Sequence, residues 1–470
     1  MTWQTTTDAV TPPAGGGLSR LSRLSAWLRA NLFRQSVGGR PTRWQVVGGV
    51  LFVVAGVAVS LMRTSGPGAL NTTWIEDAGN LLQDGLNHSF LTNLTTQING
   101  YYLTVPRLAT AVAVLFPVSW APAVMSILAA AQYAILGLIA YIASGPLLHN
   151  QWLRLLVAAP ACLVPVGYTQ VNNDLVTVQF IALYGLFWLL LWRPTTRAGQ
   201  VCAPIVMLGA TLTSILPALL VPLVAARLIA DRSKTSIAVA VCWVAGLVTQ
   251  STVQVLGTSN RASGLFTNPL WILGNYVTEA IPRAIFGEIA LGGPGTNYRG
   301  SPVPLNIPNM AIHEALVWGA CAIVVAVVTI ALVRLTAPQW PLAVTALAFS
   351  VLLFVGEIVD NYPIVQPRYV IAPALLLYVA VVAMLRPRDA ADAAPKAAPR
   401  AVLAWAPVTV FALLLAVVVG FNYRVVNSRS ESPPWTAVVA TASQSCMQAG
   451  VTGYEYSHLW WNVHIPCSRV

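Results

Sequence analysis

Charged residues are scarce in this sequence: Asp, Glu, Lys and Arg together make up 9% of its 470 residues. Hydrophobic residues make up 56%, and the mean hydropathy is +0.68. A soluble chain of this length needs far more charge to cover its surface, so the composition excludes a soluble globular protein. Apolar runs long enough to cross a bilayer recur along the chain, and they predict an all-α polytopic membrane protein.

About eleven membrane spans are predicted from these apolar runs. They lie near residues 45–62, 121–145, 153–169, 175–192, 201–212, 214–230, 236–255, 312–333, 339–356, 369–385 and 401–421. The fifth and sixth runs are short. The alternative for these two is a single broken or re-entrant unit, which is tolerated where protein covers the backbone.

The basic residues predict the orientation. A basic arm, residues 1–43, precedes the first span, and placing it in the cytoplasm puts most of the 26 Lys and Arg residues on that side. Most acids then face outward. The net charge of +11 is therefore a topology signal, and no nucleic-acid partner is expected. We expect a multi-pass plasma-membrane protein with a cytoplasmic N-terminus and an extracytoplasmic C-terminus.

This orientation places three long segments outside the membrane: residues 63–120, residues 256–311 and the tail 422–470. Residues 44–421 form the membrane module that carries the first two. Long segments on one side are where a site would be built. Cys446 and Cys467 both lie in the tail, where an oxidising compartment favours a disulfide, and the alternative is two unrelated thiols.

Two adjacent acids, Glu76 and Asp77, follow the first span closely. The stretch around them, NTTWIEDAGNLLQDGLNHSF, has apolar residues at helical spacing and predicts an amphipathic helix. Carboxylates in the first turns of a helix are stabilised by its dipole, which is the structural interpretation. The functional interpretation is that a carboxylate at the membrane surface acts as a general base toward a hydroxyl group.

Arg368 and Tyr369 lie in QPRYV, where the last outer loop re-enters the membrane. An arginine there can bind a lipid-linked phosphate with two hydrogen bonds. The alternative is a snorkelling arginine beside an interfacial tyrosine. Further candidates for phosphate binding are Arg107, Arg283 and Arg299. Candidates for substrate binding are Asp174, Asn172, Tyr101, Tyr102 and His313. Interfacial charges and a solvated turn are the alternatives for these residues.

This layout resembles the GT-C superfamily of integral-membrane glycosyltransferases, in its bacterial form. The resemblance covers roughly residues 44–421. It rests on the acidic pair, on NGYYLTVPRLATAVAVLFP, on TLTSILPALLVPLVAAR and on QPRYVIAPALLLYVAV. It implies a GT-C-like fold and a polyprenyl-phosphate sugar donor. It also implies Asp77 as catalytic base with Glu76 as its partner, and leaves open which of the two acids acts.

We therefore expect an inverting glycosyltransferase that moves a sugar from a polyprenyl-phosphate donor to a cell-envelope glycan or glycolipid on the outer face. No cofactor and no metal site are expected, with a divalent cation held by the second acid as the open alternative. The competing hypothesis is a lipid-linked sugar flippase or polysaccharide exporter, which would carry charges within its spans. Nearly every charge lies at span ends or in loops, which favours chemistry at the outer surface.

Overall fold

The computed structural model describes residues 20–35, 39, 41–98, 100–167, 173–256, 268–291, 310–361, 365–388, 398–427, 429–458 and 461–470. Seven helices in this part of the chain are long and apolar enough to cross a membrane. They are α2 (Arg43–Met62), α6 (Ala121–Ala143), α13 (Lys234–Leu256), α17 (Met310–Leu332), α18 (Trp340–Asn361), α19 (Ile371–Met384) together with the turn Pro367–Val370 that leads into it, and α20 (Ala398–Phe421). The chain is therefore a mostly helical, multi-pass membrane protein.

The remaining predicted spans coincide with shorter helices. These are α8 (Gln151–Ala158), α9 (Pro160–Leu163), α10 (Val178–Leu191), α11 (Arg197–Thr211), η4 (Leu216–Leu220) and α12 (Val221–Ala230), with the single turn α7 (Gly145–Leu148) before them. None of them reaches the length of a full crossing on its own. Each predicted span thus coincides with helical structure, whereas the count of eleven crossings stays a prediction.

Local sequence explains how the first span begins. Thr42 caps α2, because its Oγ1 accepts a hydrogen bond from the Gln45 backbone N–H at 3.2 Å. The Gln45 side chain in turn accepts a hydrogen bond from the Thr42 backbone N–H at 2.9 Å. This reciprocal pair satisfies two amides that would otherwise lack partners at the helix start.

Helix α19 lies in the centre of the bundle, where each of its residues is buried. It packs along α18 and also contacts α10. A helix that is apolar all round and buried all round has protein on every side. Bilayer helices associate by close packing, and small residues permit it. A Cβ added at Gly56 of α2 would lie 2.8 Å from the Cβ of Ala134 in α6, so these two backbones approach at a distance that requires glycine.

The first outer segment is folded into short helices. They are η1 (Ala69–Asn71), the π-helix η2 (Asp77–Leu82), α3 (Gln83–Asn87), α4 (Phe90–Thr95), α5 (Thr104–Ala113) and η3 (Val118–Trp120). The predicted amphipathic helix is confirmed, since Trp74, Ala78 and Leu81 are buried. The helix differs from the expected α form in that Asp77–Leu82 makes one wider π turn, a feature that often marks functional sites.

The second outer segment and the tail also contain regular structure. The second segment contributes α14 (Pro269–Asn275), η5 (Tyr276–Ala280), α15 (Ile281–Phe286) and α16 (Glu288–Leu291). Between α18 and α19 lies η6 (Pro367–Val370), which leads directly into α19. The tail contributes α21 (Trp435–Cys446), β1 (Gly453–His458), β2 (Trp461–Pro466) and η8 (Cys467–Arg469).

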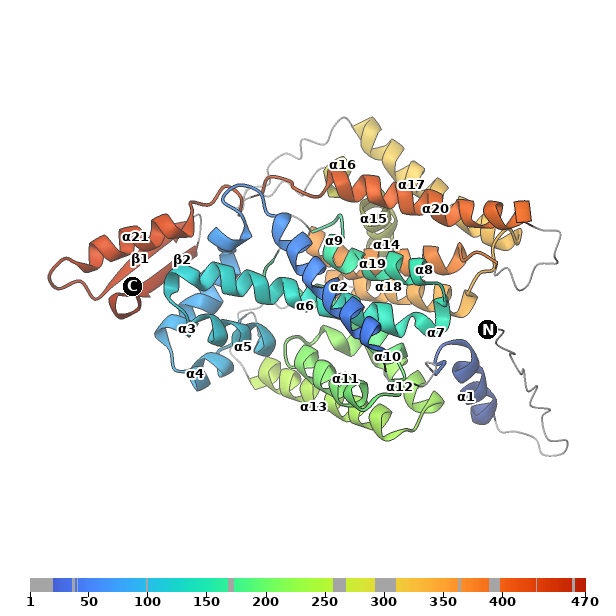
Figure 1. Ribbon diagram of the computed structural model, residues 1–470, viewed down its shortest axis with the longest axis horizontal. Coiled ribbons are helices and arrows are strands. Elements are labelled where there is room, and N and C mark those ends of the chain that lie inside the picture. Colours follow the sequence, from blue (N-terminus) through green and yellow to red (C-terminus); the bar gives the residue numbers. More distant parts are fainter. Residues whose placement is uncertain are drawn as a thin grey trace.

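The tail elements are tied together and to the first outer segment. Strands β1 and β2 pair antiparallel, from Gly453 opposite Pro466 to His458 opposite Trp461. A disulfide joins Cys446 to Cys467, with their Cα atoms 5.5 Å apart. Strand β2 contacts α3, and in Figure 1 the hairpin lies beside α3 and α21 at the end of the molecule opposite α1 (Arg20–Asn31).

Candidate functional site

The two adjacent acids of the first outer segment have different environments. Asp77 is buried, with 3% of its surface exposed. Its Oδ1 and Oδ2 accept hydrogen bonds from the Leu175 N–H at 3.1 and 2.9 Å. Its Oδ1 also accepts one from the Val176 N–H at 3.2 Å. Hydrogen bonds to a charged acceptor are the stronger kind, so Asp77 fastens the first outer segment to the turn that precedes α10.

Asp174 lies in the same turn and is fully buried. Its Oδ1 accepts a hydrogen bond from the Val176 N–H at 3.0 Å, and no described donor reaches its Oδ2. Burial first, and then the charge of Asp77 and a hydrogen bond between the two carboxyl groups, raises the pKa of Asp174 well above its usual range. Asp174 therefore binds its proton more tightly than an exposed aspartic acid does.

The raised pKa of Asp174 predicts the direction in which the stability of the protein changes with pH. The folded protein keeps a proton that the unfolded chain releases from about pH 4 upward, so Asp174 lowers the free energy of unfolding as pH rises. The asparagine of Asp174→Asn cannot ionise. As pH increases from acid to neutral, the midpoint of thermal unfolding of the wild type is therefore expected to fall relative to that of the variant. Unfolding curves recorded across this range measure the difference. Midpoints that stay parallel would show that Asp174 is not protonated by its surroundings.

Arg429, in the segment that follows α20, contacts the same region and was not among the residues singled out from sequence. Its Nη1 donates to the Asn173 carbonyl at 2.9 Å. Its Nη2 lies within hydrogen-bond distance of the carbonyls of Ala69 and Thr72, at 3.1 and 2.8 Å, and of Ser126 Oγ at 2.7 Å. One buried guanidinium thus joins the tail, the first outer segment, α6 and the turn before α10.

The charge of Arg429 balances that of the buried acids. Burial lowers the pKa of Arg429, and the negative charges of Asp77 and Asp174 oppose this effect. Of these two opposing effects, that of Asp77 is the larger. A buried charge without such a partner would be strongly destabilising. The arginine sits in NSRSES, a polar stretch that gives no sequence signal of burial.

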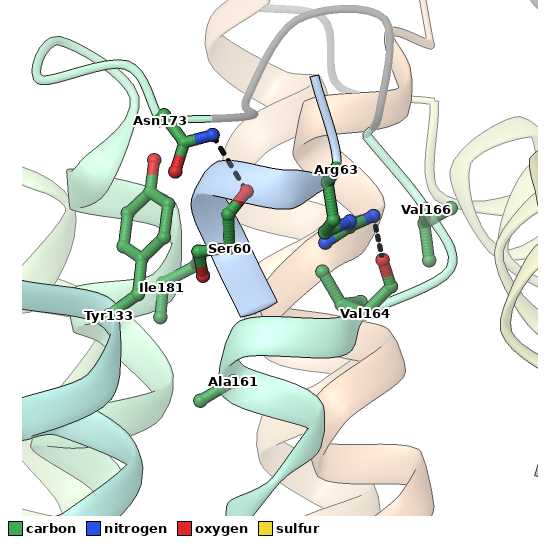
Figure 2. Close-up of a pocket in the computed structure, with 8 residues that line it drawn as sticks. All are labelled: Ser60, Arg63, Tyr133, Ala161, Val164, Val166, Asn173 and Ile181. Atoms are coloured by element: carbon green, nitrogen blue, oxygen red, sulfur yellow. Dashed lines mark hydrogen bonds between the residues drawn. The ribbon is translucent and has the colours of Figure 1, made fainter. Parts of the chain in front are cut away.

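Asn173 connects this cluster to the C-terminal end of α2 (Figure 2). Its Nδ2 donates to the Ser60 carbonyl at 2.8 Å and to Thr64 Oγ1 at 3.2 Å. Its φ of 57° is in the left-handed region, which asparagine adopts more readily than most residues. Arg63 Nη2 donates to the Val164 carbonyl at 2.8 Å on the other side of the same small cavity. The turn that holds Asp77 is therefore fixed to α2 through the Asn173 side chain and to the tail through Arg429.

Glu76 has the opposite environment to its neighbour. Its side chain is 28% exposed, and its Oε1 lies 3.5 Å from Arg368 Nη1. The Trp74 indole N–H donates to its Oε2. Arg368 is 22% exposed and its Cζ lies 5.4 Å from the centre of the Tyr369 ring. The structure therefore joins the acidic pair to QPRYV, two stretches that are far apart in the sequence.

Tyr369 and a further acid complete the surroundings of Arg368. Tyr369 is buried, and its ring centre lies 5.9 Å from that of Phe180 in α10. Its ring therefore packs against α10 and is not exposed to a ligand. Glu357, near the end of α18, is also buried, and its negative charge acts on Arg368 together with that of Glu76. Arg368 is thus a cation between two acids, of which only Glu76 is partly exposed.

Three of the other candidates lie together in a separate cluster within the first outer segment. Arg107 is buried, and its Nη1 forms an ion pair with Asp84 Oδ2 at 3.0 Å. Its Nε donates to the Tyr102 carbonyl at 3.1 Å. Tyr101 pairs with Ile98 through backbone hydrogen bonds. These contacts connect α5 with α3, and a structural role explains them without a ligand.

Of the remaining candidates, Arg283 lies in the second outer segment, His313 lies in α17, and two lie outside the described residues. Arg283 Nη2 lies 2.8 Å from Glu279 Oε2, and His313 Nε2 lies 3.9 Å from Glu279 Oε1. These three form a second cluster of charged and polar groups. Arg299 and Asn172 lie outside the described residues. Within the described part of the chain no three His, Cys, Asp or Glu side chains are grouped to hold a metal ion.

No protein-family model matches this chain, and no curated protein matches it. Its function is therefore inferred from the chemistry of the site. The Glu76–Arg368 pair combines a partly exposed carboxylate with a partly exposed guanidinium. Such a pair can accept a proton from a hydroxyl group and hold an anionic group next to it.

Proposed function

We propose that the protein is an inverting glycosyltransferase with a GT-C-like fold. It transfers a sugar from a polyprenyl-phosphate donor to a glycan or glycolipid acceptor at the outer face of the membrane. The observation that carries the proposal is the Glu76–Arg368 pair, with 3.5 Å between Oε1 and Nη1, located where the first outer segment meets the start of α19. A base for the acceptor and a cation for the departing phosphate are the two groups that this transfer needs.

In the proposed reaction Glu76 accepts the proton of the acceptor hydroxyl. The hydroxyl oxygen forms a bond to the anomeric carbon from the face opposite the phosphate. The bond from this carbon to the phosphate oxygen breaks, and polyprenyl phosphate leaves with the electron pair. Arg368 stabilises the negative charge of the leaving group through its guanidinium. Attack from the opposite face inverts the configuration of the sugar.

Glu76 takes the role of base in this proposal, and Asp77 takes a positioning role. The reason is access, because three backbone hydrogen bonds already occupy the Asp77 oxygens and its surface is 3% exposed. The phosphate of the bound polyprenyl-phosphate sugar supplies a second partner for Arg368. When the phosphate binds Arg368, the ion pair with Glu76 weakens and the carboxylate becomes available to the acceptor.

The proposed enzyme has the orientation expected from the basic residues. It crosses the plasma membrane about eleven times, with a cytoplasmic N-terminus and an extracytoplasmic tail. The Cys446–Cys467 disulfide supports an outer location for the tail, because disulfides persist in oxidising compartments. The separation of α1 from the hairpin in Figure 1 also supports it. An odd number of crossings places the two chain ends on opposite sides.

The proposed reaction is tested with purified protein and a panel of polyprenyl-phosphate sugars in the presence of candidate acceptors. The wild type is expected to release polyprenyl phosphate from one donor, and the Glu76→Gln variant serves as the inactive control. No release from any donor by folded wild-type protein would overturn the proposal. Transbilayer movement of a lipid-linked sugar in proteoliposomes, without release, would instead establish the flippase alternative.

A further inference from the structure

Helix α1 lies at the ends of the membrane helices, on the side away from the hairpin (Figure 1). The helix packs on α12, where Arg29 Nε donates to the Ala230 carbonyl, and two further hydrogen bonds hold the residues at and just beyond its C-terminal end. Arg193, which follows α10, donates from Nη1 to the Phe33 carbonyl at 3.1 Å. Gln339, which precedes α18, donates from Nε2 to the Asn31 carbonyl at 3.3 Å. Because both partners sit where membrane helices end, α1 lies at the level of the membrane surface.

An apolar stripe runs along α1 and is only half covered by protein. Leu21, Leu24 and Leu28 are spaced to share one face of the helix. Leu28 is 6% exposed, whereas Leu21 is 65% and Leu24 is 43% exposed. Trp27, next to this stripe, is 49% exposed. The described residues therefore cover the C-terminal half of the stripe and leave the N-terminal half open.

The charge on this part of the protein is positive. The sequence of α1, RLSRLSAWLRAN, contains three arginines and no acid, and Arg20 and Arg23 are both exposed. Arg34 follows the helix and lies close to Arg386, which follows α19. Burial and then the charge of Arg386 lower the pKa of Arg34. Neighbouring cations at a membrane surface favour an anionic partner.

We propose that α1 is an interfacial anchor that inserts Leu21, Leu24 and Trp27 into the adjacent leaflet and binds anionic phospholipid headgroups through Arg20 and Arg23. Around the helix Arg20 lies between Leu24 and Trp27, and Arg23 lies next to Trp27, so both arginines border the apolar stripe. Arginines in this position can extend to the headgroups while the apolar side chains insert below them. Tryptophan prefers the same depth. At this position the open stripe faces the boundary between headgroups and acyl chains. The inference is independent of the proposed glycosyltransferase activity.

The anchor is tested by spin-label accessibility in lipid nanodiscs containing the full-length protein. The label is placed at Leu24→Cys, and at Ala26→Cys on the opposite side of the helix as the matched control. Both variants carry alanine at the other accessible free cysteines, which are Cys202, Cys242 and Cys321. In discs that contain phosphatidylglycerol, oxygen dissolved in the bilayer is expected to reach the label at position 24. A water-soluble nickel complex is expected to reach the label at position 26.

The role of the arginines is measured in the same discs. Arg20→Gln and Arg23→Gln are each expected to lower the equilibrium constant for insertion of α1 into the leaflet about fivefold, which is the contribution of one basic residue near an anionic surface. Arg388→Gln, an exposed arginine beyond α19, is the matched control and should leave the label at position 24 unchanged. Equal access of the nickel complex to both labels would overturn the proposal. Shielding of position 24 from both reagents would also overturn it, since protein would then cover the stripe.

Discussion

Replacing Glu76 with glutamine is expected to lower sugar transfer by about 10²–10⁴-fold, the usual contribution of a general base. Glutamine keeps the size of the side chain, and its carbonyl oxygen can still accept the hydrogen bond from the Trp74 indole. It cannot take a proton from the acceptor and has no charge to pair with Arg368. The midpoint of unfolding should change little, because the Trp74 hydrogen bond is kept and the lost ion pair is partly exposed. Initial rates of polyprenyl-phosphate release measure the loss.

Glu455 provides a matched control for this variant. It is an exposed glutamate on β1 that pairs with His464, with 2.7 Å between Oε1 and Nδ1. Glu455→Gln removes the same charge from the protein surface and should retain the wild-type rate. A Glu76→Gln enzyme that works within a few-fold of the wild type would remove Glu76 from the reaction. Equal losses in both variants would point to a general effect of surface charge.

Replacing Arg429 with methionine is expected to have the largest effect on stability. Arg429 donates hydrogen bonds to several buried oxygens and balances the charge of Asp77. Methionine fills a similar volume but leaves these groups unsatisfied and the carboxylate unpaired. Removing one partner of a buried ion pair costs about 3–5 kcal/mol. We expect a sharply lower unfolding midpoint and a lower yield of monodisperse protein.

Arg424 is the control for the arginine variant, because it lies nearby in the same segment and is exposed. Arg424→Gln should unfold at the wild-type temperature, since exposed charges contribute little to stability. A normal midpoint for Arg429→Met would contradict the assignment of Arg429 as the group that balances Asp77.

The membrane helices and the amphipathic helix of the first outer segment could be predicted because their signals are local. Apolar runs mark the spans, and helical spacing marks the buried face of the segment that begins at Trp74. The same spacing distinguishes the two acids. Asp77 falls on the buried face with Trp74 and Leu81, whereas Glu76 falls on the opposite face. This signal was present in the sequence and favours Glu76 over Asp77 as the accessible acid.

The contacts that set the environment of the acids could not be predicted in the same way. Asp77 is held by backbone amides about a hundred residues further along the chain, and Arg429 comes from the tail. Such partners depend on tertiary packing and not on local pattern. The polar stretch around Arg429 is typical of an exposed loop, and only the fold places it inside. The pairing of Glu76 with Arg368 depends on packing in the same way.

The most direct test compares Glu76→Gln with Asp77→Asn, each measured for its unfolding midpoint and for polyprenyl-phosphate release per folded molecule. We expect Glu76→Gln to keep its midpoint and lose release. We expect Asp77→Asn to lose stability, because the amide presents a donor to backbone N–H groups, and to retain measurable release in its folded fraction. The opposite pattern, a stable but inactive Asp77→Asn beside an active Glu76→Gln, would show that Asp77 is the base.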